Sequence, residues 1–146
     1  MKGKVELKIV LLDKKLPPPQ YMTPGAVGMD LYAAKSVSLT PGEIQLIPTG
    51  IKVAVPEGYE LQIRPRSGLA TQGLGMVNSP GTIDNDYRGE IKICLINLGK
   101  STFMIKKGER IAQAVLSPVA RARIKCVDYL DSTSRGEGGF GHTGTR

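Results

Sequence analysis

The sequence predicts an all-β sandwich or barrel with at most one short helix, and three observations support this fold class. The chain of 146 residues contains 18 Gly and 10 Pro, which interrupt it at regular intervals. The segments between them are short, and they alternate polar with apolar residues or are rich in β-branched residues. No long amphipathic helical pattern is present. Short strands with regularly spaced turns are typical of sandwiches and barrels.

Each predicted element follows from local patterning. In the clearest strand, Tyr59, Leu61 and Ile63 alternate with Glu60 and Gln62, which gives one apolar and one polar face. The other strands are shorter versions of this pattern or continuous β-branched runs. The predicted strands are residues 5–12, 37–39, 43–48, 51–55, 59–63, 90–97, 102–105, 111–116 and 123–129, and the predicted helix, of a turn or two, is residues 67–72.

The chain length predicts one domain, residues 1–131, followed by a flexible C-terminal arm, residues 132–146. The arm holds five Gly and no Ile, Leu, Val or Met, so it cannot bury enough apolar area to fold by itself. It does carry Phe140, His142 and Arg135. A disordered tail and a mobile lid are both compatible with this composition, and the motifs described below favour the lid.

Composition limits the function classes. The formal charge is +7, but no block of five like charges occurs and aromatic residues make up only 5%. This argues against a nucleic-acid polymer as partner and favours a small phosphorylated ligand. The sequence has no apolar run that could span a membrane and no signal peptide, so a cytoplasmic protein without membrane contact is expected. Cys94 and Cys126 are expected to be reduced core thiols.

Two motifs near the first half of the chain could carry charge chemistry. A glycine-rich turn delivers Asp30 into an apolar strand, where it could bond nearby backbone N–H groups, hold a metal-bound water or orient an Arg. Arg66, Ser67 and Gly68 open the predicted helix and could form an oxyanion-binding corner. The alternative is an N-cap Ser beside a surface Arg.

Two further motifs follow. Residues 78–90 are typical of a hairpin that turns into a strand, with Asp84 and Asp86 on one strand face and Tyr87 just beyond. Hairpin backbone groups can read the edge of a planar base, although a polar hairpin with solvated acids is equally built from such residues. Gln113 could donate to an anion or be a surface residue.

The sequence contains no P-loop, no Rossmann glycine pattern and no His/Cys metal cluster. What remains is a carboxylate base, several arginines and hydroxyls, and an aromatic lid. This set suits the hydrolysis of a nucleoside polyphosphate with a divalent ion.

Taken in order, these segments resemble the trimeric deoxyuridine triphosphate nucleotidohydrolases, the dUTPases. The resemblance extends from about residue 16 to residue 145, and five motifs in the family's order make it very specific. The motifs are Gly28-Met29-Asp30-Leu31-Tyr32-Ala33, Pro65-Arg66-Ser67-Gly68, Gly81-Thr82-Ile83-Asp84-Asn85-Asp86-Tyr87-Arg88-Gly89, Gly108-Glu109-Arg110-Ile111-Ala112-Gln113 and Arg135-Gly136-Glu137-Gly138-Gly139-Phe140-Gly141.

The resemblance implies a distorted jelly-roll barrel of the β-clip type that forms a homotrimer with active sites shared between chains. It implies hydrolysis of dUTP to dUMP and pyrophosphate, in which Asp84 activates the water that attacks the α-phosphorus. Asn78 and the hairpin after it would read uracil, and Tyr87 would stack under the deoxyribose. The hairpin residues expected to touch the substrate are Gly81, Thr82 and Ile83.

The phosphate chain would be held by Arg66, Ser67 and Gly68, with help from Gln113. Mg²⁺ would be the cofactor, chelated mainly by the triphosphate, with Asp30 acting on it through water.

From the arm, the resemblance implies that Arg135 binds the γ-phosphate and that Phe140, followed by Gly141, covers the uracil. His142 and Thr143 would line the phosphates. Arg64 receives no role, because the family often has a small or apolar residue there. The alternatives are dCTP deaminase, which shares the fold, and a non-enzymatic β-barrel module.

Overall fold

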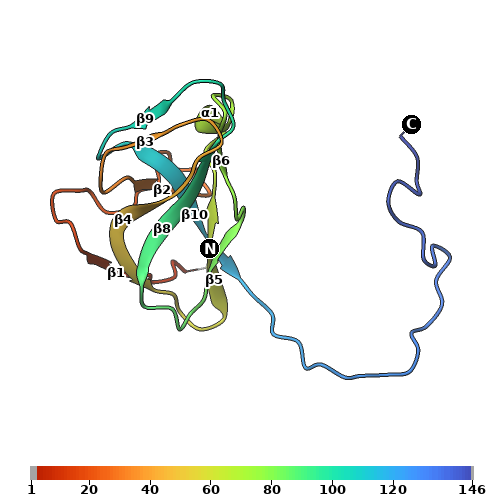
Figure 1. The fold of residues 1–146 in the computed structure, drawn as a ribbon. Coiled ribbons are helices and arrows are strands. Elements are labelled where there is room, and N and C mark those ends of the chain that lie inside the picture. The colour runs from red at the N-terminus through yellow and green to blue at the C-terminus, as the bar shows by residue number, and fades with distance from the viewer. Residues whose placement is uncertain (1–2, 146) are drawn as a thin grey trace.

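The computed structural model describes residues 3–145 and is mostly β with one short helix, which confirms the predicted fold class (Figure 1). Eight of the nine predicted strands have a counterpart, and the helix lies where the sequence placed it. The elements are β1 (Lys8–Leu11), β2 (Met29–Tyr32), β3 (Val37–Leu39), β4 (Ile44–Ala54), β5 (Tyr59–Arg64), α1 (Ser67–Ala70), β6 (Leu74–Met76), β7 (Gly81–Ile83), β8 (Glu90–Asn97), β9 (Phe103–Ile105) and β10 (Arg110–Pro118).

The strands form two antiparallel four-stranded sheets and a two-stranded ribbon. The first sheet has the order β1-β4-β8-β6, the second has the order β2-β10-β5-β7, and the ribbon pairs β3 with β9. The core is formed by alternate side chains, such as Ile91 and Ile93 on β8 and Leu61 and Ile63 on β5. The period of two along each strand therefore fixes which residues are buried, as the sequence indicated.

Strand β4 replaces two predicted strands, residues 43–48 and 51–55. A register shift against β8 lies between Pro48 and Lys52, at the gap between the two predicted strands. The Thr49 hydroxyl donates to the Ile91 carbonyl at 2.6 Å, and the Gly50 N–H donates to Glu90 Oε1 at 3.0 Å. These side-chain bonds replace ladder bonds lost at the irregularity, so the chain continues as one strand.

The predicted strand over residues 123–129 is wrong for this structure. The segment is extended but has no regular secondary structure, and Ile124 and Tyr129 are each 87% exposed. A strand needs a neighbour to pair its N–H and C=O groups, and patterning cannot say whether a neighbour is present. The short strand β6 was missed because its three residues include Gly75 and show no alternation.

The barrel's last strand ends at Pro118, and the chain then runs away from the barrel to the C-terminal arm (Figure 1). Cys94 is half-buried and Cys126 is exposed, and both are free thiols. The expectation of a core position is therefore wrong for Cys126. Across residues 3–145, no helix has the length and apolarity required to cross a bilayer.

Candidate active site

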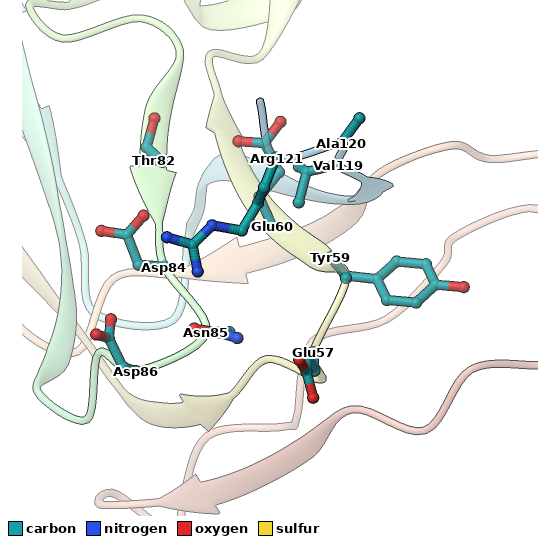
Figure 2. Close-up of a pocket in the computed structure, with 11 residues that line it drawn as sticks. Glu57, Tyr59, Glu60, Thr82, Asp84, Asn85, Asp86, Val119, Ala120 and Arg121 are labelled. Carbon is teal, nitrogen blue, oxygen red and sulfur yellow. The ribbon is translucent and has the colours of Figure 1, made fainter. Parts of the chain in front are cut away.

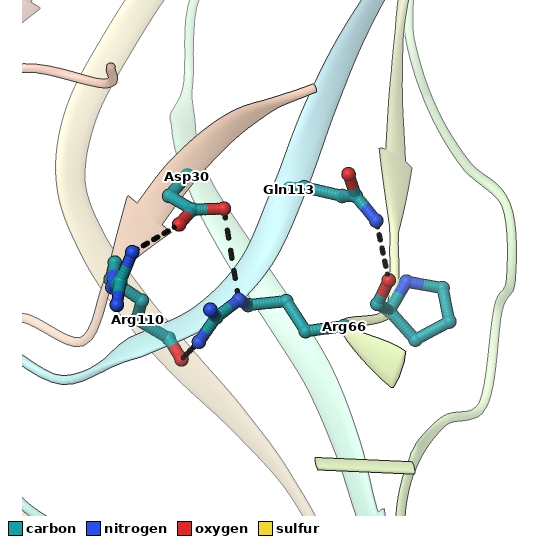
Figure 3. Close-up of polar contacts among 5 residues, drawn as sticks. Asp30, Arg66, Arg110 and Gln113 are labelled. Atoms are coloured by element: carbon teal, nitrogen blue, oxygen red, sulfur yellow. Dashed lines mark hydrogen bonds and ion pairs between the residues drawn. The ribbon is translucent and has the colours of Figure 1, made fainter. Parts of the chain in front are cut away.

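Three of the five motifs meet at one corner of the second sheet. Strand β10 lies between β2 and β5, so that Gln113 pairs with Asp30 on one side and with Arg64 on the other. The Arg66 side chain reaches the same corner from the segment that follows β5 (Figure 3). The antiparallel register therefore brings together residues separated by as many as 83 sequence positions, which are Asp30, Arg66 and Gln113.

Asp30 occupies this corner as a buried carboxylate between two guanidinium groups. Its Oδ2 accepts a hydrogen bond from Arg110 at 2.9 Å, and its Oδ1 lies 3.7 Å from Arg66 Nε. Arg66 also donates from its terminal nitrogen to the Arg110 carbonyl at 3.0 Å (Figure 3). Of the interpretations open for Asp30, the structure thus supports the one in which it orients an Arg.

A β-bulge makes this contact possible. Strand β10 advances from Arg110 to Ala112 while β2 advances from Tyr32 to Leu31, so that Ile111 is the additional residue. If the strand alternated regularly from Gln113 without a bulge, Ile111 would point outward and Arg110 would point inward. With it, Ile111 is 1% exposed in the core and Arg110 reaches Asp30 on the outer face. Bulges commonly re-aim side chains in this way beside active sites.

Gln113 fastens the second motif to β10. Its amide Nε2 donates to the Pro65 carbonyl at 3.0 Å, and its Oε1 packs against the backbone of Gly28. A Cβ at Gly28 would collide with this amide. The Gln113 side chain is therefore half-buried and bonded to the protein.

The helix α1 begins directly after the arginine corner. Arg66, with extended backbone, is the N-cap residue and makes no side-chain cap, so the alternative of an N-cap Ser67 is wrong. Ser67 and Gly68 lie exposed in the first turn. The Thr71 hydroxyl donates to the Gly68 carbonyl at 2.9 Å, which stabilises the turn from its C-terminal side.

The third motif follows β7, which pairs with β5. Asp84 and Asp86 are exposed in the turn after this strand, which corrects the prediction that they share a strand face. The Tyr87 N–H donates to the Asp84 carbonyl at 3.2 Å. Arg88 closes the turn by donating to the carbonyls of Asn85 and Tyr87 at 2.7 and 2.9 Å. The turn thus holds the Asp84 carboxylate toward solvent.

Tyr87 is fixed on the same turn. Its hydroxyl donates to the Glu90 carbonyl at 2.9 Å, and its ring lies against Gly89, where an added Cβ would overlap the ring. On the other side of β7, the Asn78 amide lies over Gly81, whose hypothetical Cβ would be 3.4 Å from Asn78 Nδ2. The predicted hairpin residues therefore lie on β7 or next to it, with Gly81 buried, Ile83 half-buried against the core and Thr82, Asp84 and Tyr87 exposed.

The two halves of the site are separate within one chain. Ile83 pairs with Leu61, so Asp84 lies level with Glu60 near the start of β5. Arg64 is four residues further along, which corresponds to roughly 13 Å of strand, and Arg66 lies beyond it. The two clefts that contain Asp84 include neither Arg66 nor Gln113.

Asp84 lines a cleft of about 450 Å³ together with Glu60, Asp86 and Arg121 (Figure 2). The Arg121 guanidinium points toward Thr82 and Asp84 in this cleft (Figure 2). Sequence reasoning did not identify Arg121, because it lies in no motif. The Val119 N–H donates to the Gly58 carbonyl, and this bond anchors the chain two residues before Arg121. The spacing of residues in the sequence does not predict this contact.

The arm residues lie apart from both halves (Figure 1). Arg135 Nε donates to the Gly138 carbonyl at 2.8 Å, and the His142 ring packs on Gly138. Phe140 is fully exposed with φ 49°. Gly141 and Thr143 belong to the turns that follow. The arm is thus a series of tight turns that presents an uncovered aromatic ring.

Residues 3–145 contain no group of three or more His, Cys, Asp or Glu side chains that could hold a metal ion.

Arg64 is bonded along its own strand, since its Nε and terminal nitrogen donate to Gln62 Oε1 at 3.0 and 2.6 Å. Gln62 in turn donates to Glu60 at 2.7 Å. This polar ladder occupies Arg64 away from Asp30.

The comparisons with known proteins show that this mostly β fold, with two arginines around Asp30 and an exposed carboxylate hairpin, is that of an enzyme class that hydrolyses nucleotides. The family model for dUTPase matches residues 14–144. The chain is 56% identical to the deoxyuridine 5'-triphosphate nucleotidohydrolase of Thermoanaerobacter sp. (strain X514), which it covers over 94% of its own length and 97% of the relative's. It is 59% identical to the enzyme of that name from Chlamydia pneumoniae, over 86% and 90% of the two chains. This chain belongs to the dUTPase family.

Solved structures agree. The dUTPase of Staphylococcus bacteriophage 80alpha with dUpNHpp superposes with a TM-score of 0.90 at 29% identity, over 97% of this chain and 100% of that chain. A dUTPase from phage phi11 of S. aureus, described as coordinating a structural Mg(II) ion, superposes with a TM-score of 0.80 at 25% identity. It is covered over 98% of its length, with 86% of this chain.

Proposed function

We propose that this dUTPase hydrolyses dUTP to dUMP and pyrophosphate (EC 3.6.1.23), with Asp84 as the base that activates the attacking water. The observation that carries the proposal is the 56% identity to a deoxyuridine 5'-triphosphate nucleotidohydrolase over 94% of the chain, with all five motifs intact. As a hydrolase of nucleotide metabolism, it would limit uracil incorporation into DNA and supply dUMP for dTMP synthesis.

Asp84 suits the role of base because its carboxylate is exposed at the tip of a tightly bonded turn. The three ion pairs among residues 3–145 do not include it, so its lone pairs are available to a water molecule. The water would attack the α-phosphorus in line, and pyrophosphate would leave. Positioning and charge neutralisation contribute most of the rate in such reactions.

The phosphate chain would bind at the arginine corner. Arg66, Ser67 and Gly68 lie just beyond the end of β5, and Gln113 donates to the Pro65 carbonyl that precedes them. Gln113 retains a second N–H on the same amide for a phosphate oxygen. These donors would neutralise charge on the departing pyrophosphate.

Mg²⁺ would be carried mainly by the triphosphate, since it keeps several waters and prefers phosphate oxygens with one or two carboxylates. Asp30 fits a water-mediated contact, because each carboxylate oxygen has a second lone-pair site beside the one that faces an arginine. When bound, the ion would neutralise phosphate charge and favour displacement of pyrophosphate.

The base and sugar would be selected by the hairpin. Asn78 and the backbone of Gly81, Thr82 and Ile83 would pair with the uracil edge, and cytosine would leave such groups unpaired. The Tyr87 ring, fixed by its bond to the Glu90 carbonyl, would stack under the deoxyribose and leave no room for a 2′-hydroxyl.

The arm, residues 132–146, would close the site as a lid on the domain formed by residues 1–131. Phe140 and Gly141 would cover the uracil, Arg135 would bind the γ-phosphate, and His142 and Thr143 would line the phosphates. Closure would expel water and complete the catalytic arrangement. The exposure of the Phe140 ring supports a role on a surface outside its own barrel.

A homotrimer with shared sites would bring the two separate halves together. The separation of Asp84 from Arg66 along β5 supports this arrangement, because neither of the clefts described above that Asp84 lines includes Arg66. The protein would act in the cytoplasm, without nucleic acid or membrane as partner. Sedimentation should give three times the chain mass of 15.7 kDa.

The first test is pyrophosphate release with Mg²⁺ from dUTP, dCTP, dTTP and UTP in parallel. Release from dUTP alone is expected. Ammonia release from dCTP with an intact triphosphate would instead identify a deaminase, and no reaction with folded protein would leave a binding module.

Mixing two variants with strongly reduced activity tests the shared site. Asp84→Asn and Arg66→Gln chains, unfolded and refolded together, should recover part of the wild-type turnover, because some mixed trimers contain an intact site. Each variant refolded alone is the control. No recovery in the mixture would place both residues of a site in one chain.

A further inference from the structure

Arg110 belongs to the fourth motif, but neither the sequence reasoning nor the substrate contacts proposed above give it a role. The structure nevertheless fixes the direction of its side chain. The additional residue Ile111 interrupts the alternation of β10, and this interruption turns Arg110 from the core toward Asp30. A bulge that changes the direction of one side chain indicates that the direction itself matters.

Arg110 contacts the corner twice. Its guanidinium donates to Asp30 Oδ2 at 2.9 Å, and its backbone carbonyl accepts from Arg66 at 3.0 Å. The other carboxylate oxygen of Asp30, Oδ1, lies 3.7 Å from Arg66 Nε, so the three residues form a closed ring of contacts. Arg66 is thereby held at two of its nitrogens by groups that Arg110 supplies or controls (Figure 3).

The two cations share Asp30 unequally. Arg110 makes the shorter contact and Arg66 the longer one, so Arg110 provides most of the compensation for this carboxylate. A guanidinium has five N–H donors, and two of those on Arg66 face Asp30 and the Arg110 carbonyl. The others stay available, and with one carboxylate between two arginines the corner keeps an excess positive charge.

We propose that Arg110 is a positioning residue that acts through Arg66: it satisfies Asp30, so that Arg66 is oriented but not consumed by the carboxylate and can bind the phosphate chain. This rests on the proposed dUTP hydrolysis and on the role of Arg66 in it. Without the Arg110 side chain, Asp30 becomes the partner of Arg66 alone and draws that guanidinium into a direct pair, away from the substrate.

A double-mutant cycle tests the proposal, with Arg66→Gln, Arg110→Gln and the double variant assayed for pyrophosphate release from dUTP. Arg110→Gln should lower kcat/KM about tenfold or more, because a small displacement of a positioning group is costly. In the Arg66→Gln background the same change should cost less than about twofold, because the group it positions is gone. Lys100→Gln, in an exposed turn, is the control for losing one cation.

The outcomes of the cycle either support or overturn the role proposed for Arg110. A tenfold loss from Arg110→Gln in both backgrounds would overturn the proposal, since a general structural defect adds to any other lesion. No loss in the wild-type background would also overturn it. Thermal unfolding shows whether Arg110→Gln is folded, and if it is not, Arg110→Lys takes its place in the cycle, with a smaller but equally non-additive loss expected. Wild-type protein that releases no pyrophosphate from dUTP would refute the proposed function instead.

Discussion

The arginine corner and the Asp84 hairpin differ in how far one chain completes them. In the corner, Asp30, Arg66 and Gln113 are bonded to protein partners across three segments. In the hairpin, Asp84 is exposed, and only its backbone and the neighbouring Tyr87 and Arg88 are fixed. The corner is preorganised by its own fold, whereas the base proposed on the hairpin would be completed by a partner surface. Substitutions should therefore separate the two regions by their balance of stability and activity.

The largest effect is expected at the hairpin. Asp84→Asn should lower kcat about 10²- to 10⁴-fold, the usual contribution of a general base, with an unchanged melting temperature because the carboxylate is exposed. Pyrophosphate release and thermal unfolding measure the two quantities. Asp86→Asn, an exposed carboxylate in the same turn, is the matched control and should retain turnover. Full activity of Asp84→Asn would show that Asp84 is not the general base.

Removing residues 132–146 should lower turnover about 10²-fold or more while the barrel stays folded, because the arm lies outside the core (Figure 1). Steady-state kinetics and a melting curve of the truncated chain give the comparison. A chain that lacks only residues 144–146 and keeps Phe140 is the control. A steep fall in melting temperature would show that the arm is structural.

In the corner, Asp30→Asn should affect stability as well as activity. The substitution leaves two arginines with a neutral partner, and hydrogen bonds to charged groups contribute about 1.5–3 kcal/mol. Urea unfolding should give a lower free energy of unfolding by roughly that amount. Asp86→Asn is again the reference. An unchanged unfolding free energy would mean that the corner is no more rigid than the hairpin.

Gly89→Ala tests the hairpin's selectivity. The added methyl group would collide with the Tyr87 ring and displace it, so the preference for dUTP over UTP should fall roughly tenfold. The ratio of the two kcat/KM values is the measurement. Gly25→Ala, where a Cβ would meet no atom within 4 Å, is the control. A preserved ratio would show that Tyr87 does not select the sugar.

The smallest effect is expected outside both regions. The Lys107 ammonium, followed by the Lys15 N–H, holds the pKa of Asp13 below its usual 3.8. This stabilisation is present above the ordinary pKa and is lost as the pH falls through the lowered one. Asp13→Asn should slightly lower the melting temperature at pH 7, and this difference should shrink as the pH falls below 3.8 and through the lowered pKa. A difference that persists at low pH would exclude the ion pair as its cause.

The sequence by itself determined the all-β class, most strand positions and the family. Alternation such as that of Tyr59, Leu61 and Ile63 reports directly which face is buried, because side chains along a strand have a period of two. The motif residues could also be identified from the sequence, since turns require Gly, Asp and Asn at particular places. These are local properties, so local patterns carry them.

Tertiary structure decided what depends on neighbours. Residues 123–129 have a strand pattern but no strand to pair with among residues 3–145. Arg110 would point inward by alternation, and only the register of β10 against β2 turns it toward Asp30. The separation of Asp84 from Arg66 likewise follows from the antiparallel pairing of β7 with β5, which places Asp84 level with Glu60 while Arg66 lies beyond the other end of the strand. Pairing is a long-range property, because it depends on which segments meet after folding and on where a bulge shifts their register.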